Sequence, residues 1–175
     1  MIKKIIQFLV IFFIWISYGY SEIIKDIQIL GNKRISNETI LVLGDTSKLK
    51  DFNKNDLNDT LRKLYETKFF KDVKISFDDG ILKIQVKENP IIENIEIVGI
   101  KNKKFSEEIL KQINLKNRMS FTENQLNKDI ESIKNLLKVN GFYFANVKTS
   151  INENNELNSI RIKINIDQGQ KAKIK

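Results

Sequence analysis

The stretch IIENIEIVG at residues 91–99 repeats the stretch IIKDIQILG at residues 23–31 almost position for position. In both stretches apolar and polar residues alternate, which is the pattern of a strand with one buried and one exposed face. Each stretch ends in a glycine, which suits a turn with positive φ. Because the two stretches lie 68 positions apart, we expect one architectural unit to occur twice along the chain.

Two helical patterns follow each of these strands. Short helices are expected over residues 37–43 and 107–113, with Ser36 and Ser106 as their N-caps. A longer amphipathic helix comes next in each unit, and Asn140-Gly141 suits the C-terminal cap of the second one. A capping box formed by Thr122 and Gln125 is expected at its start. The apolar stripes of the longer helices are Leu57, Leu61, Leu64 and Tyr65 in the first unit and Leu126, Ile130, Ile133 and Leu137 in the second.

Two more strands complete each unit. In the first unit they cover residues 69–77 and 81–87, joined by a tight turn at Asp78-Asp79-Gly80. In the second unit they cover residues 143–151 and 160–166, joined by a polar loop at residues 152–158. The predicted fold class is therefore α+β, with two tandem β-α-α-β-β units. Each unit has a three-stranded mixed sheet covered by two helices.

The predicted boundaries follow from this repeat. The first unit covers residues 22–89 and the second covers residues 90–169, with Pro90 at the junction. Residues 170–175 read as the truncated start of a third unit. Residues 1–21 read as a signal peptide, because two lysines precede a short apolar run that ends in small residues. The alternative for this segment is an uncleaved membrane anchor, although the apolar run is short for a spanning helix.

The composition excludes several classes of site. The chain of 175 residues contains no Cys and no His, so disulfides, thiolate zinc sites and histidine bases are excluded. The net charge is +8, but 26 of the 30 basic residues are Lys and they alternate with acidic residues, which favours a solvated mixed-charge surface over a nucleic-acid partner. Asp78 and Asp79 are interpreted as turn residues and not as a catalytic pair. We therefore expect no enzyme activity, no catalytic residue, no metal and no cofactor.

Five aromatic residues lie at matching places in the two units. They are interpreted as core anchors between helix and strand, in preference to a base-stacking platform. These residues are Phe69, Phe70, Phe142, Tyr143 and Phe144.

The stretches LRKLYETKFFKDV at residues 61–73 and IQVKENPIIENI at residues 84–95, in this order, resemble tandem POTRA domains. The second stretch, with its proline between the units, is similar to the junction of the first two POTRA domains in the BamA family of outer-membrane protein assembly factors. One departure is Lys68, where the family often has Gly, whereas the second unit keeps Gly141.

The resemblance implies a location and a set of partners. It implies a signal-directed protein on the periplasmic side of the bacterial outer membrane. The implied partners are unfolded outer-membrane proteins, accessory assembly lipoproteins, periplasmic chaperones and the membrane itself, through a C-terminal β-barrel that is missing from this sequence. The alternatives are a TamA-like or two-partner secretion transporter, or a membrane-anchored division scaffold similar to FtsQ.

The resemblance also implies candidate binding residues. In the family fold the second strand of each unit lies at a sheet edge, where unpaired backbone groups can pair with an extended peptide. The alternative is that these edges stay solvated and that Lys71, Lys74 and Lys148 protect them from aggregation. The candidate residues are Asp72, Val73, Lys74, Ile75, Ser76 and Phe77 in the first unit and Ala145, Asn146, Val147, Lys148, Thr149 and Ser150 in the second.

Overall fold

The structure is a computed structural model that describes residues 22–172. The predicted signal peptide and its cleavage site lie outside the described residues. The predicted start of a third unit at residues 170–175 also lies partly outside them.

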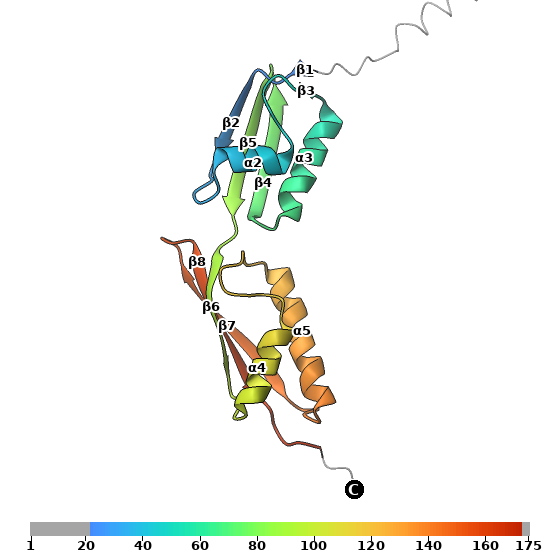
Figure 1. The fold of residues 1–175 in the computed structure, drawn as a ribbon, viewed down its shortest axis with the longest axis vertical. Helices are drawn as coiled ribbons and strands as arrows, with labels where there is room; N and C mark the ends of the chain where they lie inside the picture. Colours follow the sequence, from blue (N-terminus) through green and yellow to red (C-terminus); the bar gives the residue numbers. More distant parts are fainter. Residues whose placement is uncertain (1–21, 173–175) are drawn as a thin grey trace, which may run out of the picture. The chain divides into compact units, whose positions relative to one another are not determined.

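The predicted order of strand, two helices and two strands occurs twice, and the first repeat adds the short strands β1 and β3, which pair with each other (Figure 1). The first repeat contains β1 (Glu22–Ile23), β2 (Asp26–Leu30), α2 (Asn37–Gly44), β3 (Asp51–Phe52), α3 (Lys54–Glu66), β4 (Phe70–Asp78) and β5 (Ile81–Glu88). The second repeat contains β6 (Ile91–Val98), α4 (Lys103–Gln112), α5 (Glu123–Val139), β7 (Asn146–Asn154) and β8 (Ser159–Asp167). The predicted α+β class is confirmed.

Each repeat builds a three-stranded sheet in which the last strand is central. The order is β2-β5-β4 in the first sheet and β6-β8-β7 in the second. β2 pairs parallel with β5, and β6 pairs parallel with β8. The tight turn at Asp79 and Gly80, both with positive φ, makes β4 and β5 antiparallel, and β7 pairs antiparallel with β8. Both sheets are therefore mixed, as predicted.

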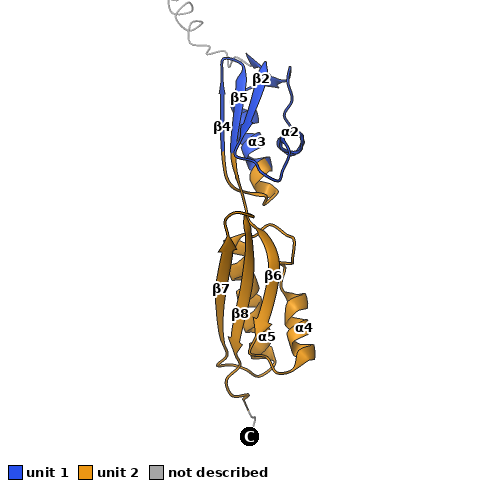
Figure 2. Ribbon diagram, turned by 90° about the vertical axis from the view of Figure 1, so that its left-hand side faces the viewer, with its two compact units in different colours: residues 1–63, 74–85 blue, residues 64–73, 86–175 orange. Residues whose placement is uncertain are grey.

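By compactness the chain divides into two units whose limits cut through the first repeat. One unit holds the described residues up to Lys63 together with Lys74–Gln85 (Figure 2). The other holds Leu64–Val73 and the described residues from Val86 onward. The division passes through α3, β4 and β5.

The core of the second repeat lies between its helices and one face of its sheet. β8 alternates strictly, and its isoleucines at positions 160, 162, 164 and 166 are all buried. They pack with Ile109 of α4 and with Leu126, Ile133 and Leu137 of α5, and Ile130 is partly buried against them. The apolar stripe predicted for α5 is confirmed. In the first repeat, Leu82, Ile84 and Val86 of β5 are buried in the same alternating way.

The predicted helix caps are mostly confirmed. Ser36 caps α2 by accepting a hydrogen bond from the Thr39 N–H, and Thr122 caps α5 by accepting one from the Gln125 N–H. In a full capping box the Gln125 side chain would also bond back to the Thr122 backbone. Here the Gln125 side chain donates to Asp129 instead. After α5 the chain turns at Gly141, whose φ is 89°.

Two predicted boundaries are wrong. α4 begins at Lys103 with Asn102 as its N-cap, not at Glu107 with Ser106, because the Asn102 side chain already accepts from the Phe105 N–H. β7 covers residues 146–154, not 143–151, so that the turn to β8 is confined to residues 155–158. Tyr143 and Phe144 are residue types that favour strands although they lie in the turn before β7, which explains the second error.

One shared turn has no signal in the sequence. Leu49 and Arg118 both have positive φ, at 65° and 68°, and both precede the long helix of their repeat. Each donates its N–H to the first strand segment, Leu49 to the Ile24 carbonyl and Arg118 to the Ile92 carbonyl. The N–H of Ile24 or Ile92 donates back one residue later along the turn, to Lys50 or Met119. The two repeats therefore share a pair of backbone hydrogen bonds between this turn and the first strand segment, here called the backbone clamp. The residues at the turn differ between the repeats.

Candidate functional site

The sheet order places β4 and β7 at edges, opposite β2 and β6. The predicted residues Asp72–Phe77 lie within β4, and Asn146–Ser150 lie within β7. Ala145 does not belong to the strand, because it lies in the turn before β7 and its N–H donates to the Phe142 carbonyl. The structure thus brings eleven of the twelve candidate residues onto sheet edges.

β7 is a regular edge strand. All nine of its residues pair with β8, from Asn146 opposite Asp167 to Asn154 opposite Ser159. In an antiparallel pair, alternate residues direct their N–H and C=O groups toward the partner, and the remaining residues direct theirs away from it. The outward backbone groups of β7 therefore form a row of hydrogen-bonding positions along the second sheet.

The side chains of β7 leave this row accessible. Val147 and Thr149 are half-buried toward the helices, whereas Asn146, Lys148 and Ser150 are exposed. A shallow hollow extends over the sheet from β7 across β8 to β6, lined in part by Ser150–Glu153, Arg161, Lys163 and Glu96. Lys148 keeps one positive charge on the strand itself, and no other charged residue lies between Asn146 and Asn152.

β4 is less regular than β7. Phe70 and Val73 are both buried, three positions apart, and the half-buried Ile75 and Phe77 then resume the alternation. Next to this irregularity, the Tyr65 hydroxyl of α3 accepts a hydrogen bond from the Val73 N–H at 3.1 Å. The same hydroxyl donates to an Asp72 carboxylate oxygen at 3.3 Å. The sequence pattern places Tyr65 on the apolar stripe of α3, but its ring is 42% exposed and it acts through its hydroxyl.

The turn before β4 contains the departure from the family pattern. Lys68 has a φ of 60°, so it adopts the left-handed conformation that Gly141 adopts at the matching place in the second repeat. The Thr67 hydroxyl donates to the Leu64 carbonyl and accepts from the Phe69 N–H, which holds this turn from within. The glycine geometry is therefore kept by a lysine, at a cost of about 1 kcal/mol of backbone strain.

The interpretation of the aromatic residues as core anchors is partly wrong. Phe70 is buried, and the partly buried Phe142 packs against Phe105 with ring centroids 6.1 Å apart. Tyr143 and Phe144, by contrast, are 60% and 85% exposed. They lie in the turn that precedes β7, because the strand begins only at Asn146.

Exposed ion pairs are distributed over both repeats. The hydrogen bond from the Ser159 hydroxyl to Glu93, together with the Arg161 guanidinium 2.7 Å away, lowers the pKa of Glu93. A hydrogen bond from Lys48 lowers the pKa of Asp26 in the same way. Both carboxylates pair with a cation at the surface of a sheet, and their pKa values are lowered. This arrangement is typical of surface ion pairs and not of a catalytic acid or base.

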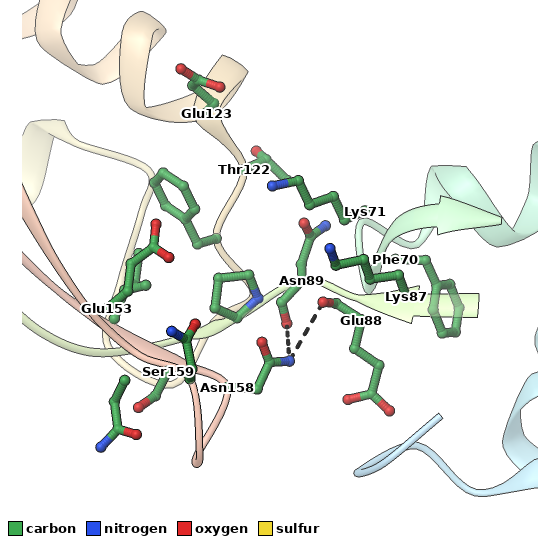
Figure 3. A pocket seen from close by; sticks show the side chains of 15 residues that line it. Phe70, Lys71, Lys87, Glu88, Asn89, Thr122, Glu123, Glu153, Asn158 and Ser159 are labelled. Carbon is green, nitrogen blue, oxygen red and sulfur yellow. Dashed lines mark hydrogen bonds between the residues drawn. The ribbon is translucent and has the colours of Figure 1, made fainter. Parts of the chain in front are cut away.

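A pocket of about 400 Å³ lies within the second compact unit (Figure 3). The Asn158 side-chain amide lies 3.5 Å from the main-chain oxygens of Glu88 and of Asn89. Positively and negatively charged side chains both line the pocket, among them Lys71, Lys87, Glu123 and Glu153. This mixture does not match the few convergent polar groups of an apolar ligand pocket.

Residues 22–172 carry neither a metal-binding cluster nor a membrane-spanning helix. That range contains no cluster of three or more potential metal-ligating carboxylates. Within the same range, no helix is both long enough and apolar enough to span a bilayer.

A buried carboxylate that the sequence analysis missed holds the second repeat together. Asp129 of α5 is 1% exposed and accepts four hydrogen bonds, from the Asn114 N–H and side chain, the Leu115 N–H and the Gln125 side chain. These bonds fix the segment between α4 and α5 and do not contact either sheet edge. An acidic residue inside an apolar stripe is the one sequence signal that points to such a role.

Known proteins resemble this chain in sequence and in fold. The family model described as "POTRA: Surface antigen variable number repeat" matches residues 90–169. The outer membrane protein assembly factor BamA of Nitratidesulfovibrio vulgaris is 26% identical over 156 residues, which cover 87% of this chain and 20% of that protein. BamA of Buchnera aphidicola is 28% identical over 176 residues, covering 97% of this chain and 28% of that protein. The chain thus spans less than a third of the length of either relative.

A solved structure shares the fold. The N-terminal domain of Omp85 from Thermosynechococcus elongatus superposes with a TM-score of 0.55 at 15% identity, covering 86% of this chain and 64% of that one. The expected resemblance to the BamA family is confirmed by the curated relatives, and the expected fold by this structure. The POTRA family model thus matches residues 90–169, and the chain as a whole is similar in sequence to BamA outer-membrane protein assembly factors and in fold to the N-terminal domain of an Omp85 protein.

Proposed function

We propose that the chain is the periplasmic POTRA region of an outer-membrane protein assembly factor and that it binds unfolded outer-membrane proteins by strand addition. The observation that carries the proposal is the edge of β7, nine residues long and fully paired on its inner side. An extended client segment would continue the second sheet by pairing with the outward N–H and C=O groups of β7. The role is one of binding, and it requires no catalytic group.

Backbone pairing suits clients of this kind. Segments that become strands of a membrane barrel alternate apolar and polar residues and share little sequence beyond that pattern. Hydrogen bonds to the β7 backbone are indifferent to side-chain identity, so that one edge accepts many such segments. The half-buried Val147 and Thr149 offer apolar contact on one face of the added strand, and the exposed Lys148 and Ser150 offer polar contact on the other.

The wider setting follows from the relatives and is part of the same proposal. The BamA proteins that this chain matches are named as outer membrane protein assembly factors. We place this chain on the periplasmic side of that membrane, where accessory lipoproteins and chaperones deliver clients and a barrel segment receives them. The exported location depends on the predicted signal peptide at residues 1–21.

The test is a titration of the isotope-labelled chain with a synthetic peptide of ten alternating Val and Thr residues flanked by lysines. Backbone amide shifts are expected along residues 146–154 and in the adjacent β8. Shifts confined to α4 and α5, with the β7 amides unmoved, would refute strand addition at this edge.

A pair of proline variants sharpens the test. Because neighbouring residues of β7 direct their N–H groups to opposite sides, one of Lys148→Pro and Thr149→Pro removes an outward donor and the other removes a donor to β8. The first kind of variant should keep the fold and lose peptide binding, whereas the second should loosen the hairpin. Retained binding in the well-folded variant would contradict the proposal.

A further inference from the structure

The two candidate edges differ at matching positions. Counted from the left-handed turn residue, Lys68 or Gly141, Tyr65 corresponds to Lys138 and Val73 corresponds to Asn146. In the first repeat a phenol hydroxyl accepts the strand N–H at this place. In the second repeat a lysine stands there, and an ammonium group has no lone pair with which to accept an N–H.

The hydroxyl of Tyr65 uses both of its hydrogen-bonding roles on β4. It accepts the N–H of Val73 and donates to the carboxylate of Asp72. Because a backbone N–H is a single donor, the Val73 N–H is not available to an added strand while this bond exists.

The irregular spacing of β4 coincides with this contact. Phe70 and Val73 are buried with two exposed residues between them, so the strand gains one residue relative to strict alternation. Such bulges bend an edge and interrupt its row of outward groups. The bulge and the hydroxyl therefore act on the same segment, residues 71–73.

No matching contact protects β7. In residues 22–172, the side chains of α4 and α5 form no hydrogen bond with the β7 backbone among those that the structure records. The strand also keeps an unbroken register with β8 over all nine pairs. β7 thus offers a continuous edge, and β4 offers a short one that begins after Val73.

We propose that the Tyr65 hydroxyl closes the N-terminal part of the β4 edge and so directs strand addition to β7. Tyr65 is then a specificity-determining residue that selects between two otherwise similar edges of one chain. This inference rests on the proposed function, because it presumes that an extended peptide pairs with these sheets. It adds which edge is used and which side chain decides it.

The test combines amide hydrogen exchange with peptide titration on the full chain. Tyr65→Phe removes the hydroxyl and keeps the ring, and Tyr143→Phe is the control, since it removes an exposed phenol hydroxyl elsewhere. In Tyr65→Phe the Val73 amide should exchange up to about tenfold faster, which is the loss of one ordinary hydrogen bond. With the alternating Val/Thr peptide, the original chain and the control should shift amides of β7 and β8 but none of β4, whereas Tyr65→Phe should also shift residues 71–76.

Three results would count against the inference or its foundation. An unchanged Val73 exchange rate in Tyr65→Phe would show that the hydroxyl does not hold this edge. Equal shifts along β4 and β7 in the original chain would show that the edge is not closed. Absence of shifts at both edges in every variant would instead refute strand addition itself, and the exchange rate of Val73 would still decide whether the hydroxyl bond exists.

Discussion

The two repeats join their helices by different polar contacts. In the first repeat the Thr60 hydroxyl of α3 donates one hydrogen bond, to the Gly44 carbonyl at the end of α2. In the second repeat Asp129, 69 positions later, accepts four hydrogen bonds from the segment after α4 and from Gln125. The same position thus holds the segment after the first helix with one hydrogen bond in one repeat and three in the other. Equal topology does not require an equal distribution of stabilising interactions.

The largest effect is expected from Asp129→Ala. The substitution leaves the Asn114 and Leu115 N–H groups without their acceptor inside the fold and should lower the free energy of unfolding by about 3–5 kcal/mol. Thr60→Val, which removes the one hydrogen bond that Thr60 donates to Gly44, should cost about 1 kcal/mol. Urea unfolding of both variants measures the difference. Similar losses in the two variants would contradict the contrast between the repeats.

The next effect concerns the glycines that end the repeated strands. Gly31 and Gly99 have positive φ, at 87° and 94°, but a Cβ on Gly99 would also overlap the Ile166 carbonyl oxygen of β8. Gly99→Ala should therefore cost about 3 kcal/mol or more, because backbone must move. Gly31→Ala should cost about 1 kcal/mol from its φ alone. Thermal unfolding of the two variants tests the asymmetry, and equal shifts in Tm would refute it.

A smaller effect of opposite sign is expected at the turn before β4. Lys68→Gly relieves a left-handed residue and should stabilise the chain by about 0.5–1 kcal/mol, the strain being partly offset by the greater freedom of glycine in the unfolded state. Gly141→Lys should destabilise it, because it introduces the same strain into the second repeat. Denaturant midpoints measure both changes. Destabilisation by Lys68→Gly would show that the lysine side chain has a role that outweighs its backbone strain.

The smallest effect concerns pH. Glu93 has its pKa lowered by the Ser159 hydroxyl and Arg161, whereas Lys25 stands at its place in the first repeat. Because the folded pKa lies below the unfolded one, near 4.5, this contribution is present above that value and disappears as the pH falls through the folded pKa. The stability difference between the chain and Glu93→Gln should therefore shrink from pH 7 to pH 3. A difference that stays constant over this range would exclude the linkage, and an NMR titration of the Glu93 carboxyl reads the pKa directly.

Several features of the fold are predictable from local patterns. The alternation of β8, the apolar stripe of α5 and the Ser36 cap of α2 all depend on residues that are close in the sequence. The predicted starts of α4 and β7 are wrong because, at each place, two nearby positions are equally compatible with the local sequence pattern. Asn102 and Ser106 are both good caps, and Tyr143 and Phe144 are both good strand residues.

The candidate site likewise has parts that were predictable from the sequence and one contact that was not. The strands that contain its residues follow from alternation, and their position at sheet edges followed from the resemblance to POTRA domains. The contact between Tyr65 and Val73 could not be predicted, because Tyr65 fits an apolar stripe by its spacing and its hydroxyl finds a partner only in the folded chain.

The repeat, the α+β class and the two helices and three long strands of each unit are readable from local patterns, since they follow from periodicity and caps over short distances. The tertiary structure alone decided the backbone clamp at Leu49 and Arg118, the role of Asp129 and the difference between the β4 and β7 edges. These features depend on hydrogen bonds between residues far apart in the chain or on a left-handed φ adopted by ordinary residues. Neither leaves a periodic signal, because a single donor and a single acceptor suffice wherever the fold brings them together.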